Sequence, residues 1–127
     1  QLLALQKQVR ALYVDPTLLQ FAVKVVAATR DPAKAGLPGA ARLILYGASP
    51  RATIGMIEAG RALAFLRGRD YVLPEDVIDV TADVLRHRIV LSYEALSEGV
   101  SADELVRQIL KAIPAPGKML ESHVRVA

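Results

Sequence analysis

The sequence predicts an all-α domain, a small bundle of four to five helices, in which residues 89–93 could add one short extended pair. Three observations predict this fold class. Apolar residues make up 53% of the 127 positions, which is enough for one compact core. Most of them are aliphatic, since the chain has no Trp and only 5% aromatic residues. Helix-on-helix packing commonly buries side chains of this kind. Along most of the chain they recur at three- and four-residue steps, which is helical periodicity.

The first two helices are predicted from stripe spacing and a start signal. A first stripe consists of Leu2, Leu5, Val9 and Leu12. Asp15-Pro16 then predicts a capping residue followed by proline at the first position of a helix that runs to about Arg30. Most of this second helix is apolar around its circumference, which predicts burial on more than one side; the positions are Leu18, Leu19, Ala22, Val23, Val25, Val26 and Thr29.

Proline and glycine punctuate residues 31–48, which predicts a structured loop whose role stays open. Ser49-Pro50-Arg51 predicts the next helix start, and Gly68 its end. The expected buried stripe of this helix is Ala52, Met56, Ala59, Leu63 and Leu66. Gly55 and Gly60 interrupt it, which favours close approach of a neighbouring helix.

Two further helices follow. Pro74 begins one, with Glu75 and Asp76 as complements to the positive end of its dipole and Arg86-His87-Arg88 at its far end. Its expected buried face is Val77, Ile78, Thr81, Val84 and Leu85. Ser101-x-x-Glu104 is a capping box for the last helix, which ends before Pro114 and buries Leu105, Val106, Ile109, Leu110 and Ile113. We expect one domain over residues 1–116 and a loosely ordered tail over 117–127.

Several function classes receive no support. The net charge of +3 is low for a phosphate-backbone binder, although Arg67, Arg69 and residues 86–88 leave a helical nucleic-acid-binding module open as an alternative. A protein-interaction bundle is a second alternative. No membrane span or signal peptide is visible, so we expect a cytoplasmic protein. With no Cys, and with His87 and His123 far apart, no metal site is predicted.

One constellation suggests anion binding, namely Gly47-Ala48-Ser49-Pro50-Arg51. A helix N-terminus presents unpaired backbone N–H groups, and an arginine in the first turn adds a forked charge that suits phosphate. The alternative is that Arg51 is solvated or paired with Glu58. Because the sequence has no Gly-x-x-x-x-Gly-Lys-Ser/Thr loop, the chain is not expected to bind or hydrolyse a nucleoside triphosphate in the P-loop manner by itself.

The chain resembles the C-terminal lid of MoxR-type AAA+ ATPases from about Leu2 to Pro116. The resemblance is carried by four runs in the right order: Thr29 to Pro32, Tyr46 to Thr53, Arg61 to Val77, and Val84 to Ala95. Two departures are visible. Leu73 stands where relatives often have a capping Thr or Ser before Pro74, and the loop over residues 31–46 is long.

The resemblance implies that the chain continues a longer protein, as its start at Gln1 in a helical pattern also suggests. In this family the arginine corresponding to Arg51, called sensor 2, faces the γ-phosphate of ATP in the neighbouring core. The implied site is Ser49 and Arg51, with Arg51 taking part in catalysis in the intact enzyme and ATP with Mg as the cofactor. Implied partners are the chain's own core, neighbouring subunits of a ring, expected to be a hexamer, and proteins with a von Willebrand factor A domain. The implied activity is chaperone-like remodelling or maturation of partner proteins, coupled to ATP hydrolysis.

Overall fold

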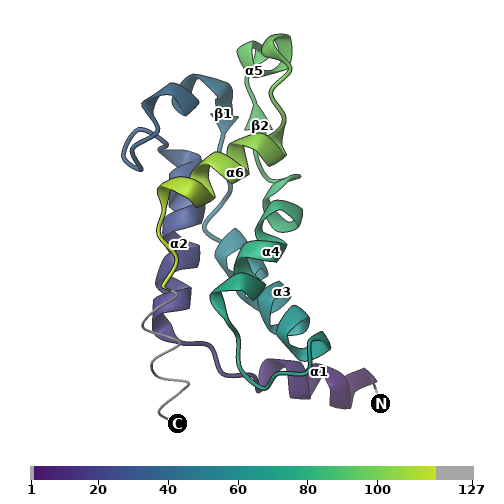
Figure 1. Cartoon of the computed structure of the whole chain (residues 1–127). Helices are drawn as coiled ribbons and strands as arrows, with labels where there is room; N and C mark the ends of the chain where they lie inside the picture. The colour runs from purple at the N-terminus through teal and green to yellow at the C-terminus, as the bar shows by residue number, and fades with distance from the viewer. Residues whose placement is uncertain (1, 117–127) are drawn as a thin grey trace.

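A computed structural model describes residues 2–116. The elements are α1 (Leu2–Arg10), α2 (Pro16–Arg30), a 3-10 helix η1 (Pro38–Leu43), β1 (Ile44–Tyr46), α3 (Ala52–Leu66), α4 (Pro74–Leu85), β2 (Val90–Leu91), α5 (Tyr93–Glu98) and α6 (Ala102–Ala112). The predicted all-α class is confirmed, since the only sheet among these residues is the two-stranded β1–β2 pair. Figure 1 shows an elongated molecule with α1 at one end, the β1–β2 pair and α5 at the other, and α2, α3, α4 and α6 between them. Within residues 2–116, no helix has both the length and the apolar character that crossing a bilayer requires.

Helix α2 begins where the sequence predicts. The Asp15 carboxylate accepts hydrogen bonds from the backbone N–H of Thr17, at 2.9 Å, and from its hydroxyl, at 2.7 Å. This satisfies one of the donors that a helix start leaves unpaired. A short parallel bridge between Tyr13 and Tyr71 then ties the segment before α2 to the segment before α4. Two parts of the chain that are far apart in sequence are thus joined at the α1 end of the molecule.

Helices α3 and α4 form the most closely packed pair. A Cβ built on Gly60 would lie 3.2 Å from Val77 Cγ2, and one built on Gly55 would lie 3.4 Å from Val84 Cγ1. The predicted close approach at these two glycines is therefore confirmed. The turn between the helices is closed by Gly68, whose φ of +80° lies in the left-handed region that favours glycine. Its N–H bonds to the Phe65 carbonyl and that of Arg69 to the Ala64 carbonyl, which is a Schellman end.

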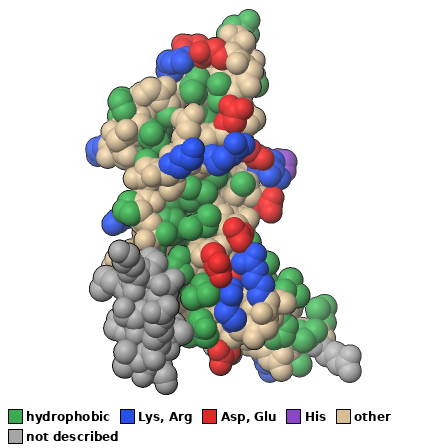
Figure 2. Space-filling view, viewed as in Figure 1, with side chains coloured by type: hydrophobic (Ala, Val, Ile, Leu, Met, Phe, Trp, Pro, Cys, Tyr) green, Lys and Arg blue, Asp and Glu red, His purple; other side chains and the backbone are tan. Residues whose placement is uncertain are grey.

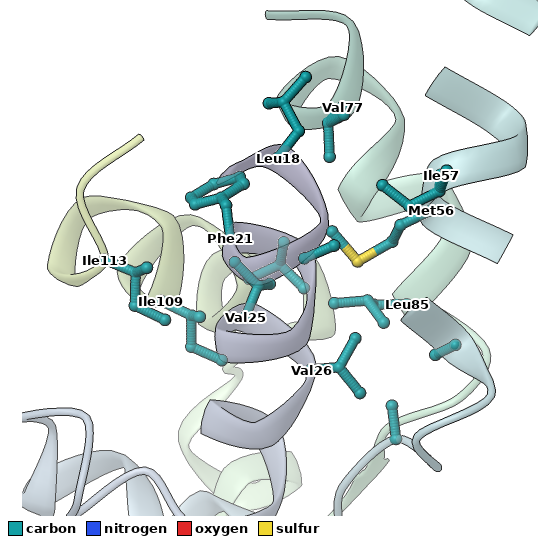
Figure 3. Close-up of a cluster of buried hydrophobic side chains, with 14 of the residues drawn as sticks. Leu18, Phe21, Val25, Val26, Met56, Ile57, Val77, Leu85, Ile109 and Ile113 are labelled. Atoms are coloured by element: carbon teal, nitrogen blue, oxygen red, sulfur yellow. The ribbon is translucent and has the colours of Figure 1, made fainter. Parts of the chain in front are cut away.

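The hydrophobic core lies between α2, α3, α4 and α6. Figure 3 shows side chains of α2 pointing toward those of the other three helices. The fully or almost fully buried members include Leu18, Phe21, Val25, Val26, Met56, Ile57, Val77, Leu85, Ile109 and Ile113. Helix α6 lies across α2 and α4 (Figure 1) and begins at the predicted cap, where Ser101 Oγ accepts the Glu104 N–H. Removal of this aliphatic surface from water is the main driving force for the fold.

Some predicted buried positions are wrong. On α2, Leu19 and Val23 remain about half exposed, so this helix buries one broad face and not its whole circumference. On α3, Leu66 is 80% exposed, while Ile57, Gly60 and Ala64 are buried. The buried face of α3 is displaced because the glycine-containing side of the helix packs on α4. Spacing alone could not show which of two adjacent apolar stripes faces the neighbour.

The loop over residues 31–46 is folded. It contains η1 and β1, and β1 pairs antiparallel with β2, which confirms the short extended pair. The structure adds a helix that the sequence reading missed, α5, which starts at the Ser92 cap and ends at Gly99, with a φ of +73°. Arg42 holds this helix to η1 through ion pairs with Glu94 and Glu98. A second small core of Ala40, Leu43, Ala95 and Leu105 lies beneath it.

Candidate functional site

The predicted anion site begins at the start of α3. Regular helical hydrogen bonding starts at Ala52, two residues later than predicted, after a tight turn over residues 49–51. In this turn the N–H groups of Ala52, Thr53 and Ile54 donate to carbonyls three residues back. The Arg51 N–H donates to Ser49 Oγ at 3.2 Å. The expectation of unpaired backbone donors here is therefore wrong, because the Ser49 cap and the 3-10 bonds already satisfy them.

What the site offers an anion is a guanidinium and a hydroxyl. Arg51 is exposed, and within residues 2–116 its side chain makes no ion pair with a carboxylate, so the alternative pairing with Glu58 is not formed. Ser49 is also exposed, and its hydroxyl proton is free to donate because the Arg51 N–H uses only an oxygen lone pair. The positive end of the α3 dipole adds to the same field. Ser49 and Arg51 thus lie in one turn, joined by the hydrogen bond from the Arg51 N–H to Ser49 Oγ, and both residues are exposed.

The loop before Arg51 is held tightly by the end of α2. The Ala48 N–H donates to Thr29 Oγ1 at 2.8 Å, and the Ala48 carbonyl accepts from Arg30 Nη1 at 3.0 Å. Thr29 and Ala48 are both fully buried. We call these two hydrogen bonds the Ala48 anchor. The sequence analysis placed Thr29 in an apolar stripe and in a run that resembles the family, but gave it no role. The physical signal was a hydroxyl on a buried face, which must find a partner.

Gly47 completes this contact by its lack of a side chain. A Cβ at this position would lie 2.3 Å from the Thr29 carbonyl oxygen and 2.6 Å from the Arg30 backbone nitrogen. These are backbone atoms, so they cannot move aside as a flexible side chain could. Glycine is needed at position 47 because the loop crosses directly against α2, and not because of its backbone dihedral angles.

We expect Gly47→Ala to lower the free energy of unfolding by about 1–3 kcal/mol, since it overpacks against backbone. Gly55→Ala is the matched control. Its Cβ would meet only the end of Val84 at 3.4 Å, and alanine favours the helix, so stability should rise by up to about 1 kcal/mol. Urea unfolding of both variants tests this. Equal stability changes in the two variants would show that the close crossing at Gly47 is not a constraint.

Four of the other arginines in residues 2–116 form ion pairs with carboxylates, namely Arg42, Arg67, Arg69 and Arg86. Figure 2 shows basic side chains (Lys and Arg, blue) and acidic side chains (Asp and Glu, red) lying side by side on one face. Arg86 binds Asp103 through two nitrogens, at 2.8 and 3.0 Å. This hydrogen bonding lowers the pKa of Asp103 and raises that of Arg86. Arg88 donates to the Val84 carbonyl at the end of α4, and exposed His87 stands between them, at the helix end where cations are favoured.

Arg67 and Arg69 meet at a buried carboxylate, that of Asp76. Asp76 is 0% exposed and accepts from Arg67 Nη1 at 2.9 Å, from Arg69 Nη2, and from the Leu73 N–H at 2.8 Å. The last bond supplies half of a capping box and compensates for the missing side-chain cap at Leu73. Asp76 is therefore more than the surface dipole complement predicted from the sequence, because it joins the end of α3 to the start of α4.

Three of the arginines on which the nucleic-acid alternative rests, Arg67, Arg69 and Arg86, are thus paired with carboxylates. We expect the chain not to bind duplex DNA at about 150 mM salt, since binding needs several cations free to neutralise phosphates. Fluorescence anisotropy with labelled DNA over a salt series measures this. An affinity that falls steeply as salt rises would support the nucleic-acid alternative instead.

No metal centre is indicated in the described part of the chain. Among residues 2–116, no three or more His, Asp or Glu side chains lie together in a way that could hold a metal ion. His87 belongs to the exposed end of α4. His123 and the tail predicted over residues 117–127 lie outside the described residues. The candidate site remains the pair Ser49 and Arg51 at the start of α3, supported by the Ala48 anchor.

Comparison with known proteins identifies the family. Residues 39–109, more than half of the chain, match the family model described as the AAA lid domain. "Chaperone MoxR1" of Mycobacterium tuberculosis is 44% identical over 115 residues, which cover 91% of this chain and 30% of that protein. "Protein MoxR" of Paracoccus denitrificans is 41% identical over 110 residues, covering 82% and 32% respectively.

A solved structure agrees with these matches. The crystal structure of a proposed ATPase from Cytophaga hutchinsonii is similar with a TM-score of 0.83 and 42% identity, over 85% of this chain and 33% of that one. The chain spans about a third of the length of the relatives that it matches. The matched region includes the start of α3 and the whole α3–α4 pair. The chain belongs to the AAA lid domain family, as the lid of a MoxR-type AAA+ ATPase.

Proposed function

We propose that this chain closes over ATP bound in an ATPase core domain and that Arg51 contacts the γ-phosphate. The observation that carries the proposal is an exposed arginine, unpaired within residues 2–116, on a loop fixed to the lid by the Ala48 anchor. A guanidinium can bind two phosphate oxygens at once. It therefore favours the closed lid while the terminal phosphate is present, and less so after hydrolysis.

The chemistry of hydrolysis belongs to the core in this proposal. ATP with Mg supplies the reacting phosphate there, while Arg51 binds and orients it and Ser49 donates a further hydrogen bond. Arg51 is thus a catalytic residue only in the intact enzyme, meaning this chain together with its core. We expect the 127-residue chain alone not to hydrolyse ATP, because it has no P-loop. Phosphate release by the purified chain, above that of a denatured sample, would contradict this division of roles.

In this proposal, movement of the lid drives the remodelling of other proteins. The family and the name of the relative "Chaperone MoxR1" support a chaperone-like function, in which cycles of closure and opening remodel or mature partner proteins. We propose further that the intact protein forms a ring, a hexamer, and that proteins with a von Willebrand factor A domain are among its partners. Cross-linking or light scattering of the intact protein with ATP would measure the ring size.

Hydrogen exchange of the intact protein tests the lid closure. Residues 47–54 should exchange more slowly with a non-hydrolysable ATP analogue than with ADP, because the closed lid shields the start of α3 from water. Residues 102–112 of α6 serve as the internal control. Equal exchange of residues 47–54 in the two nucleotide states would argue against closure of this face over the γ-phosphate.

A further inference from the structure

The Ala48 anchor holds one residue of the loop at both of its backbone polar atoms. Thr29 Oγ1 accepts the Ala48 N–H, while its own hydroxyl proton goes to the Val26 carbonyl at 2.6 Å. The hydrogen bond to Val26, within α2, thus fixes the orientation of the Thr29 hydroxyl group, so that its oxygen faces the loop as an acceptor. Arg30 closes the other side by donating to the Ala48 carbonyl. Consecutive residues at the end of α2 therefore bind the N–H and the C=O of a single residue in the loop.

Ala48, fixed in this way, lies three residues before Arg51. Between them, Ser49 Oγ accepts the Arg51 N–H and proline at position 50 restricts its own φ. Few backbone torsions are then free between the end of α2 and the arginine. Because α2 is the central helix of the core, packing on α3, α4 and α6, the backbone position of Arg51 is set by the body of the lid.

We infer that Thr29 is a positioning residue for Arg51, holding it in place for the γ-phosphate through the Ala48 backbone. The inference rests on the proposed role of Arg51 and adds the residue that makes that role efficient. An arginine on a fixed loop binds phosphate without first ordering the backbone, and that ordering would otherwise weaken binding. Loss of the Thr29 hydroxyl should therefore weaken recognition of the γ-phosphate in particular.

The competing explanation is that Thr29 only satisfies a buried N–H and stabilises the fold. Thr81 provides the matched control. It too is fully buried, and its hydroxyl donates to the Val77 carbonyl at 2.6 Å. Within residues 2–116, the structure gives this hydroxyl no hydrogen bond to the loop before α3. Thr29→Val and Thr81→Val each remove a buried hydroxyl from a core helix, but only the first changes the support of Arg51.

The experiment uses the intact enzyme and compares its affinities for a non-hydrolysable ATP analogue and for ADP. Thr29→Val should weaken binding of the analogue about five- to tenfold, the effect of one buried hydrogen bond, and change ADP binding less than about twofold. Thr29→Ser keeps the hydroxyl and should restore most of the preference. Thr81→Val should leave the ratio of the two affinities unchanged. In an Arg51→Ala background, Thr29→Val should have no further effect on that ratio.

The outcomes separate this inference from the proposed function. If Arg51→Ala weakens binding of the ATP analogue and Thr29→Val does not, the positioning role is wrong and the lid function stands. An equal effect of Thr29→Val with and without Arg51 would also overturn the inference. If Arg51→Ala changes neither affinity, the proposed function itself fails.

A second variant covers the case in which Thr29→Val does not fold. Arg30→Ala removes the other bond to Ala48 from an exposed side chain, and should weaken binding of the analogue about two- to fivefold with little change for ADP. Exposed Arg107 on α6 gives the control variant, Arg107→Ala. An unchanged ratio of affinities in Arg30→Ala would contradict the inference.

Discussion

Replacing Arg51 with alanine in the intact enzyme is expected to lower ATP turnover about 10- to 100-fold. The reason is the loss of charge-assisted hydrogen bonding to phosphate, and a total loss of about 1.5–3 kcal/mol, the usual contribution of a hydrogen bond to a charged group, corresponds to this range. Arg51→Lys keeps the charge but not the planar fork, so turnover should be intermediate. Steady-state phosphate release at saturating ATP, together with KM for ATP, measures both variants.

Arg107→Ala is the control for charge and folding in this experiment, since Arg107 is an exposed arginine on α6. It should retain turnover within about twofold, as surface substitutions usually do. The lid of each variant should also keep the unfolding midpoint of the unmodified protein, because Arg51 makes no ion pair within residues 2–116. Unchanged turnover in Arg51→Ala would make this arginine incidental and would favour the protein-interaction alternative.

The largest effect on stability is expected from Asp76→Ala, which should lower the free energy of unfolding by about 3–5 kcal/mol. The substitution leaves Arg67 and Arg69 without the carboxylate that they share, and leaves the Leu73 N–H without its acceptor. Removing one partner from a buried ionic cluster is costly because the remaining charges stay partly desolvated. Urea unfolding of the 127-residue chain measures the change. The loss of helix is monitored by circular dichroism at about 222 nm.

Asp79→Ala provides the matched control for this second prediction. Asp79 also pairs with Arg67, at 2.7 Å, but its side chain is 48% exposed. A solvent-exposed pair contributes less than about 1 kcal/mol, so Asp79→Ala should unfold close to the unmodified chain. Similar losses in the two variants would mean that burial of Asp76 does not govern the strength of the cluster.

The local part of the fold could be predicted from the sequence. Caps and prolines at Asp15-Pro16, Pro74 and Ser101 mark helix starts, and they act through hydrogen bonds within three residues of the signal. Gly68 is predictable as a helix end for the same reason. Helix α5 carried similar signals at Ser92 and Gly99. It was missed because its six residues are too short to show a periodic stripe.

The non-local part could not be predicted in this way. Thr29 and Ala48 are 19 residues apart, and no pattern in either segment indicates that they meet. Asp76 has the position of an ordinary first-turn acid, and only the packing of α3 on α4 buries it between two arginines. The same packing decides that Ile57 is buried and Leu66 exposed. For the candidate site, sequence reading identified Ser49 and Arg51 but not the residues that hold them.

The most direct test of the central claim is a structure of the intact enzyme with a non-hydrolysable ATP analogue. We predict that the lid is closed and that a guanidinium nitrogen of Arg51 lies about 2.7–3.0 Å from a γ-phosphate oxygen, with the Thr29 and Arg30 hydrogen bonds to Ala48 kept. A closed, nucleotide-bound structure in which the Arg51 side chain points into solvent, away from the γ-phosphate, would contradict the account.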